Sequence, residues 1–263
     1  MAKLHVLLRK EELDEQRLDD HKIVVVFDIL LATTAITAAL HYGAREVVPV
    51  LDREAAMEEA AGREEGSFVL AGEYQGVTIE GFLAPYPQGL EKEVAGKSVV
   101  LSTTNGTVAV RKASGAKVVY VASLLNTQAV VQHLLENHSN ETVLLVCAGS
   151  SGEFNIEDFY GAGYFIENLT ANSEQTWQYS DAALAAHEFY KGAADDGRKL
   201  LYGSSVGKMI VKHGYAHELD FVLQKDIYPI VSYVNTDQAV VAAETKKDGR
   251  EVHAVNTNRS SDD

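Results

Sequence analysis

Six short apolar segments constrain the fold of this chain more than any other feature of its sequence. Each is rich in β-branched residues and lacks the polar–apolar alternation of a half-exposed strand. Such strands are covered on both faces, and helical patterns between several of them favour right-handed crossovers between parallel strands. We therefore predict an α/β fold, with a three-layer α/β/α arrangement around a largely parallel sheet. The expected strands span residues 22–27, 45–50, 67–70, 98–102, 117–122 and 142–147.

Helices are expected between these strands and through most of the C-terminal half. The first two helical segments end in Gly43 and Gly62, and glycine is favoured just beyond a helix C-terminus. One further strand is expected over Ile227–Val234. With no Pro-rich linker or internal repeat, we predict a single domain over residues 1–243, followed by a polar, partly frayed tail over 244–263. The expected helices span residues 32–43, 52–62, 127–138, 155–172 and 181–215.

The charge of the chain limits its partners. Its 263 residues include 23 Lys and Arg against 38 Asp and Glu, a formal net charge of −15. Such a surface repels phosphate backbones and anionic membranes, so we expect no nucleic-acid or membrane partner. An anionic substrate is still compatible with this negative charge if a metal ion, backbone N–H groups or a few cationic side chains supply positive potential at the site. Cys147 is the single cysteine, so the chain cannot form an intrachain disulfide. The lack of a disulfide fits a reducing compartment, and we therefore expect a cytoplasmic location.

Acidic residues follow several of the expected strands. Ligands of open α/β sheets bind beyond the carboxyl ends of the strands. Asp28 ends the first strand, Glu73 follows the strand SFVLAG, and Glu157 and Asp158 lie shortly after the strand that ends in Cys147. We expect these carboxylates to meet at one edge of the sheet. Each also has a structural explanation, because Asp caps helices, Glu73 precedes a turn, and acids in a first helical turn complement the helix dipole.

The segment STTNGT, residues 102–107, has the composition of an oxyanion site. Hydroxyl and amide groups donate hydrogen bonds without fixing a counter-charge. Gly106 permits a turn that points consecutive N–H groups outward, and a helix that begins near Thr107 adds its positive dipole end. The alternative is local, since Asn-Gly forms turns and Thr hydroxyls cap helices. The candidate anion-binding residues are Thr103, Thr104, Asn105, Gly106 and Thr107.

Three other patterns lack the residues that their chemistry needs. The segment GSSVGKM, residues 203–209, is one residue too short for a P-loop and has Met209 where a Mg²⁺-binding hydroxyl belongs. His213 and His217 have the spacing of a zinc pair but lack the accompanying Glu. A cysteine phosphatase would need Arg at the position of Glu153, six residues after Cys147, so a thiolate nucleophile is rejected.

Four segments together resemble the 2-phosphosulfolactate phosphatase family. They are VVVFDILLATTAITAALHYGAREVVPV, LAGEYQGVTIEGF, VVLSTTNGTVAV and VCAGSSGEFNIEDFYGAGYFIENL, in this order along the chain. The resemblance implies an α/β fold and a Mg²⁺-dependent phosphatase that converts 2-phospho-3-sulfolactate to 3-sulfolactate and phosphate. Three departures accompany it. Leu31 and Tyr74 stand where this family usually has arginines, and residues 83–87 replace a Gly-Asn-Ser-Pro element.

The resulting hypothesis is metal-assisted hydrolysis of a phosphomonoester. Mg²⁺ would be bound by Asp28, Glu73, Glu157 and Asp158, with Asp28 and Glu157 as the catalytic pair and Asp28 as general base or nucleophile. The STTNGT segment would hold phosphoryl oxygens, and Gly149 and Ser150 would hold the rest of a small anionic substrate.

The sequence also allows two alternative functions, and it leaves a homodimer as the expected assembly. The first alternative is a non-catalytic relative that binds an anionic metabolite. The second is a hydrolase that uses two carboxylates without a metal ion. A homodimer is the expected assembly if the C-terminal helices form an interface.

Overall fold

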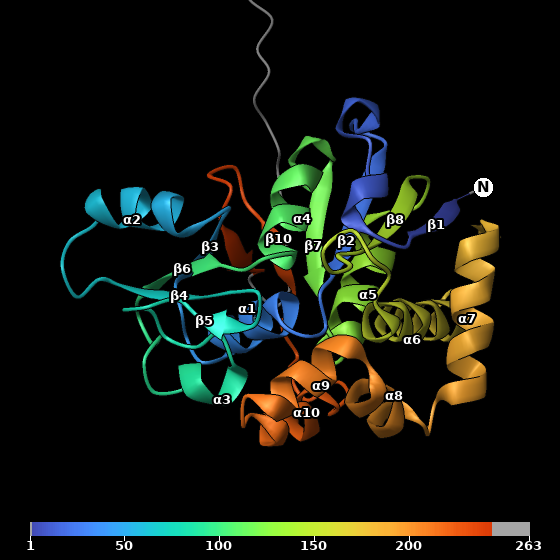
Figure 1. Cartoon of the computed structure of the whole chain (residues 1–263). Coiled ribbons are helices and arrows are strands. Elements are labelled where there is room, and N and C mark those ends of the chain that lie inside the picture. The colour runs from blue at the N-terminus through green and yellow to red at the C-terminus, as the bar shows by residue number, and fades with distance from the viewer. Residues whose placement is uncertain (1, 244–263) are drawn as a thin grey trace, which may run out of the picture.

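The computed structural model describes residues 2–243 and confirms the α/β fold (Figure 1). The strands form one sheet in the order β5-β4-β6-β3-β11-β10-β7-β2-β8-β1-β9. Two groups of parallel strands, β4-β6-β3 and β7-β2-β8-β1-β9, are joined by the antiparallel hairpin of β10 and β11. The strands are β1 (Lys3–Leu7), β2 (Lys22–Phe27), β3 (Glu46–Val50), β4 (Phe68–Tyr74), β5 (Val77–Thr78), β6 (Ser98–Ser102), β7 (Val118–Ala122), β8 (Thr142–Cys147), β9 (Gln178–Tyr179), β10 (Ser232–Val234) and β11 (Val240–Ala242).

The helices also follow the expected segments, with shorter elements in the C-terminal half. The C-terminal segment 181–215 is divided into several helices rather than one. Gly43 adopts the positive φ of 89° expected of a helix C-terminus, whereas Gly62 keeps a right-handed conformation. The helices are α1 (Ala32–His41), α2 (Arg53–Ala61), α3 (Pro87–Leu90), α4 (Gly106–Lys112), α5 (Thr127–Asn137), α6 (Ile156–Asn172), α7 (Asp181–Ala193), α8 (Gly197–Gly203), α9 (Ser205–Lys212) and α10 (Ala216–Val222).

Two parts of the sheet differ from the prediction. Residues 3–7 form β1, which pairs in parallel with β8, although no strand was expected there. The expected strand over Ile227–Val234 is confined to Ser232–Val234, because the backbone of Tyr228 donates instead to the carbonyl of Leu125. The expected frayed tail, 244–263, lies outside the described residues.

Strand β2 shows why its sequence has no polar alternation. Ile23, Val25 and Phe27 pack in the cluster that includes residues of α5, α6 and α7. Val24 and Val26 point to the opposite face and pack with residues of α1 and α4. Both faces of the central strand are therefore buried under helices, as the three-layer prediction requires.

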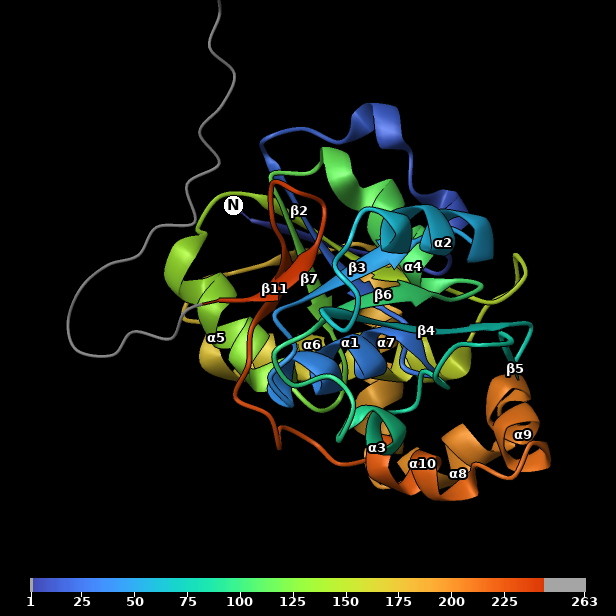
Figure 2. The same cartoon turned by 90° about the vertical axis from the view of Figure 1, so that its left-hand side faces the viewer.

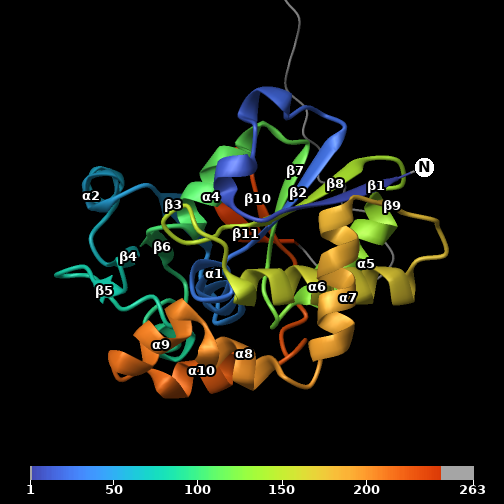
Figure 3. The ribbon, with the colours of Figure 1, turned by 45° about the vertical axis from the view of Figure 1, so that its right-hand side comes forward.

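Helices α6 and α7 pack in close contact through Gly163 (Figure 3). A Cβ at Gly163 would lie 2.7 Å from Tyr190 Cβ and would also overlap the carbonyl oxygen of Ala186. We expect Gly163→Ala to lower the free energy of unfolding by about 1–3 kcal/mol because the helices must separate. The matched control is Gly192→Ala, in α7, where no atom lies within 4 Å of the new Cβ. Urea titration should show the control at least as stable as the parent; equal losses would contradict the packing argument.

The short helices α3, α8, α9 and α10 gather at one end of the molecule (Figure 2). Tyr86, at the start of α3, stacks on Tyr215, at the start of α10, with ring centroids 4.2 Å apart. These helices therefore form a separate wall beside the sheet. Within residues 2–243, no helix is long and apolar enough to cross a membrane.

Candidate active site

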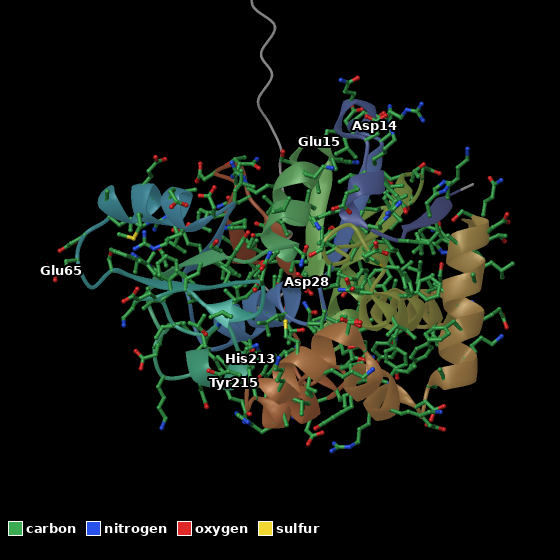
Figure 4. The ribbon with its side chains drawn as sticks, in the orientation of Figure 1. Asp14, Glu15, Asp28, Glu65, His213 and Tyr215 are labelled. Carbon is green, nitrogen blue, oxygen red and sulfur yellow. The ribbon has the colours of Figure 1, made fainter. Side chains whose placement is uncertain are left out.

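A pocket of about 390 Å³ opens where strands from both parallel groups end. Asp28 follows β2, Glu73 lies in β4, Thr103 and Thr104 follow β6, and Ser150 follows β8. Figure 4 shows Asp28 near the middle of the molecule, whereas Asp14, Glu15 and Glu65 lie at its edges. Segments far apart in the sequence thus contribute polar groups to one site. The two parallel groups run in opposite directions, because three antiparallel pairings separate β3 from β7, so a single shared edge of parallel strands, as the sequence predicted, does not explain how these groups meet.

Asp28 is held rigidly at the carboxyl end of β2. Its Oδ1 accepts the N–H of Leu31 at 2.5 Å, and its backbone N–H and carbonyl both bond to the Thr33 hydroxyl. Burial raises the pKa of Asp28 to about 6; the Leu31 N–H opposes this shift and the charge of Glu73 adds to it. The side chain therefore fixes the turn before α1 without capping the helix itself, and it also lines the pocket.

Glu73 joins the β4–β5 hairpin to the segment after β6. Its Oε1 accepts the N–H of Thr104 at 2.8 Å, and its Oε2 accepts the Thr104 hydroxyl at 3.1 Å and the N–H of Gly76 at 2.7 Å. Thr104 Oγ1 in turn accepts the N–H of Gln75 at 3.0 Å. Glu73 and Thr104 are therefore fixed relative to each other on the pocket wall.

The Thr103 and Thr107 hydroxyls cap the start of α4. Thr107 N–H donates to Thr103 Oγ1 at 3.2 Å, and Thr107 Oγ1 donates to the Thr103 carbonyl at 2.9 Å. Thr107 lies outside the pocket wall, so its N–H does not point outward as the sequence analysis expected. Of the predicted anion-binding residues, Thr103, Thr104 and Asn105 line the pocket.

Gly106 has a different role from the one predicted. It begins α4 and does not have positive φ, so the turn does not need its conformational freedom. It is needed because the chain passes very close to Asp28. A Cβ at Gly106 would lie 2.9 Å from Asp28 Cβ and would overlap both Asp28 Oδ2 and the Cβ of Ala32. The absence of a side chain there allows α4 to approach Asp28.

Lys10, which was not predicted as a site residue, holds Asn105 from behind the pocket. Lys10 is 7% exposed, and its Nζ donates to Asn105 Oδ1 at 2.9 Å and to the Ala148 carbonyl at 3.4 Å. Because Oδ1 accepts from Lys10, the Asn105 amide group is left facing Ser150, with 3.5 Å between Nδ2 and Oγ. The signal in the sequence was a lysine three residues after a short apolar segment, the unpredicted strand β1.

We expect Lys10→Met to lower kcat/KM about ten- to a hundredfold, mainly by raising KM. A hydrogen bond to a charged group contributes about 1.5–3 kcal/mol, and without it the Asn105 amide keeps only the longer contacts with Ser150 and Ser151, of 3.5 and 3.4 Å. Lys191→Met is the control, because among the described residues Lys191 pairs only with Glu188, on the surface of α7. Steady-state kinetics that show an unchanged KM for Lys10→Met would contradict this role.

The segment after β8 forms a tight turn rather than an open anion loop. Ser150 and Glu153 exchange two backbone hydrogen bonds, of 3.0 and 2.9 Å. Gly149 has φ of 64°, and a Cβ there would lie 2.6 Å from the Glu153 carbonyl oxygen. Ser150 lines the pocket as predicted, whereas Gly149 lies outside its wall and donates its N–H to Asp158.

Glu157 and Asp158, the other two predicted carboxylates, lie behind the pocket wall. Asp158 Oδ1 accepts the N–H of Ile29 at 2.8 Å and Oδ2 that of Gly149 at 3.1 Å, so Asp158 ties the segment after β2 to the segment after β8. Glu157 Oε1 is buried and has no hydrogen-bond partner within residues 2–243. Burial raises the pKa of Glu157 to about 7, and the charge of Asp28 acts in the same direction.

Cys147 does not face the pocket. It is fully buried in the core at the end of β8, and burial raises the pKa of its thiol. The structure thus agrees with the rejection of a thiolate nucleophile.

Residues of α9 and α3 complete the pocket, and the sequence analysis did not assign them to it. Ser205, Val206, Met209 and Ile210 line one side, and Tyr86 lies beside them. They include part of the GSSVGKM segment, in which the Ser204 hydroxyl caps α9 by accepting the N–H of Gly207 at 2.9 Å. That segment therefore reaches the site as a helix start and not as a P-loop.

Of the three departures from the family pattern, Leu31, Tyr74 and residues 83–87, some line the pocket and others do not. Leu31 is 8% exposed and lines the pocket, and Tyr86 of the 83–87 segment does so as well. Tyr74 is 66% exposed and is not part of the pocket wall. Two of the three departures therefore face the space that a substrate would occupy.

The arrangement fits a divalent cation through two carboxylates rather than four. Within residues 2–243, no group of three or more His, Cys, Asp or Glu side chains is placed to hold a metal ion. Asp28 and Glu73 nevertheless share one pocket, and the charge of Glu73 acts on Asp28. One or two carboxylates, completed by water and by substrate phosphate, are a common ligand set for Mg²⁺.

The fold and the pocket define an α/β protein with a preformed small-molecule site at the carboxyl ends of its strands. Comparison with known proteins gives the particular family. The model of the 2-phosphosulpholactate phosphatase family matches residues 7–237, and the chain belongs to this family.

Curated relatives cover most of the chain. A protein of Caldicellulosiruptor saccharolyticus named "Probable 2-phosphosulfolactate phosphatase" is 35% identical over 84% of this chain and 92% of its own length. Proteins with the same name from Symbiobacterium thermophilum and Thermotoga maritima are 36% and 34% identical. They cover 84% and 80% of this chain, and 94% and 88% of their own lengths.

Proposed function

We propose that the chain is a Mg²⁺-dependent phosphatase of small phosphorylated 2-hydroxy acids, a phosphoric monoester hydrolase. The relatives are named for 2-phosphosulfolactate, which is therefore the first substrate to test. The products would be 3-sulfolactate and inorganic phosphate. Family membership supports the reaction class, and the chemistry of the pocket supports the need for a cation.

The charge of the pocket wall is the observation that carries the proposal of a cation. Among the described residues, the wall contains three carboxylates, Asp28, Glu73 and Glu153, and neither Lys nor Arg. A phosphomonoester entering this space would meet like charges. Lys10 lies behind Asn105 and contributes only at a distance. Bound at Asp28 and Glu73, Mg²⁺ would neutralise phosphoryl oxygens and orient the attacking water.

The side chains of the polar wall would then orient the substrate. Asp28, held by Leu31 N–H and next to the pocket, is placed to take a proton from the attacking water or to attack phosphorus itself. The Asn105 amide, fixed by Lys10, is placed to donate to a phosphoryl oxygen. Glu157 lies behind the wall, and burial together with the charge of Asp28 raises its pKa.

Phosphate release from a panel of phosphomonoesters, with added Mg²⁺ and with EDTA, tests the proposal. We expect release with Mg²⁺ and loss of at least about 100-fold in rate with EDTA, restored by excess Mg²⁺, because the carboxylates alone repel the substrate. Activity that survives EDTA would favour a two-carboxylate hydrolase without metal. Binding without release across the panel would favour a non-catalytic relative.

A further inference from the structure

The two sides of the pocket have opposite chemistry. One side carries the groups at the strand ends, including Asp28, Glu73, Thr104 and Asn105. The wall also has an aliphatic and aromatic part, called the apolar side here, whose members are Leu30, Leu31, Tyr86, Val206, Met209 and Ile210. Val206, Met209 and Ile210 belong to α9, and Tyr86 precedes α3; both helices are in the group of short helices at one end of the molecule (Figures 1 and 3).

The apolar side is a built surface and not a chance exposure. Leu30, Leu31 and Tyr86 are at most 8% exposed, and Ile210 is 2% exposed. Met209 packs against the β4–β5 hairpin, where a Cβ at Gly76 would lie 2.6 Å from Met209 Cε. Strand β4 of that hairpin carries Glu73. The apolar side is therefore joined to the polar side through the hairpin and has a defined position relative to the carboxylates.

A substrate in this pocket presents its phosphate to the polar side and its remaining substituent to the apolar side. An anionic substituent there would lose its water and gain no positive partner, which is costly. An apolar substituent would bury its surface against Met209 and Ile210, which is favourable.

We propose that this enzyme prefers phosphorylated 2-hydroxy acids whose C3 substituent is apolar and uncharged over those that carry a sulfonate there. This inference rests on the proposed function and ranks substrates within it. The reaction is the same for both: water attacks phosphorus, the bond from phosphorus to the C2 oxygen breaks, and the 2-hydroxy acid and inorganic phosphate leave.

The experiment compares two esters that differ in one group. In 2-phosphosulfolactate, C3 carries a sulfonate; in 2-phospho-4-methylpentanoate, C3 carries an isopropyl group of similar size. With the full-length protein and Mg²⁺, we expect kcat/KM for the isopropyl ester to be about ten- to a hundredfold higher, the range in which apolar pockets discriminate. Equal values, or a preference for the sulfonate, would overturn the inference and leave the proposed phosphatase intact.

A substitution on the apolar side tests the cause of the preference. Met209→Lys places an ammonium group on the apolar side in a side chain of similar length, and we expect the ratio of the two kcat/KM values to shift at least fivefold toward the sulfonate. The control is Met57→Lys, on the exposed face of α2, which should leave the ratio unchanged. An unchanged ratio in Met209→Lys, with the fold retained by circular dichroism, counts against the inference.

A binding measurement separates failure of the inference from failure of the proposed function. Phosphonate analogues of the two esters, with CH₂ in place of the bridging oxygen, are not hydrolysed. Calorimetry should give a Kd at least about tenfold lower for the isopropyl analogue. If neither ester is turned over but this difference is present, the proposed function fails and the preference stands; if the sulfonate analogue binds as well or better, the preference fails.

Discussion

Asp28→Asn should lower Mg²⁺-dependent phosphate release by about 10²- to 10⁴-fold, the contribution typical of a positioned acid–base group. Asn keeps the oxygen that accepts the Leu31 N–H, so the loop after β2 should keep its conformation. It removes the negative charge that would bind a cation and accept a proton. Asp28→Ala should abolish release altogether, because it removes the loop-fixing oxygen as well.

A second aspartate distinguishes the catalytic role from the helix-capping role. Asp52 also follows a strand, β3, and its Oδ1 accepts the N–H of Ala55 at 2.8 Å to cap α2, but it lies outside the pocket. Asp52→Asn should therefore have nearly unchanged activity and stability. Phosphate release would be measured for both variants after thermal melting has shown that they are folded. Full activity of folded Asp28→Asn would remove Asp28 from the mechanism.

Asp28, Glu73 and Thr104 could be selected from the sequence because each lies at or just after the end of a buried strand, although the antiparallel relation between the two strand groups was not predictable. Segments 22–27 and 98–102 are apolar on both faces, so their carboxyl ends were predictable from the sequence, and polar residues at those ends face the pocket. Asp158 follows the same pattern but lies behind the wall. A sequence does not show whether a carboxylate meets backbone N–H groups, as Asp158 does with Ile29 and Gly149.

Residues outside the strand–helix alternation were beyond the reach of that argument. Lys10 reaches Asn105, which is 95 residues away in the sequence, only because residues 3–7 add a parallel strand beside β8. The five-residue segment KLHVL alternates buried and less buried positions, a signal too short to distinguish a strand from a loop. Met209 and Ile210 reach the pocket through tertiary packing of α9, which no local pattern specifies.

Gly106 was predicted to matter because of its conformational freedom, whereas the structure shows that it matters because α4 passes close to Asp28. A substitution there is the second variant with a large expected effect. We expect Gly106→Ala to lower kcat about 100-fold. Alanine favours a helix start more than glycine does, so local propensity alone would stabilise the variant. The new Cβ, however, would overlap Asp28 Oδ2 and Ala32 Cβ, and Asp28 must move. A displacement of about 1 Å at a reacting group can cost about 10²-fold in rate.

Two further variants assign that loss to Asp28. Gly192→Ala makes the same change in open space and should keep full activity. The double variant Gly106→Ala with Ala32→Gly removes the overlap with the α1 side chain and leaves the overlap with Asp28. If displacement of Asp28 is the cause, the double variant stays inactive. If it regains activity, the contact with Ala32 is the cause, and the close approach of α4 to Asp28 serves packing of α1 against α4 rather than the placement of the carboxylate.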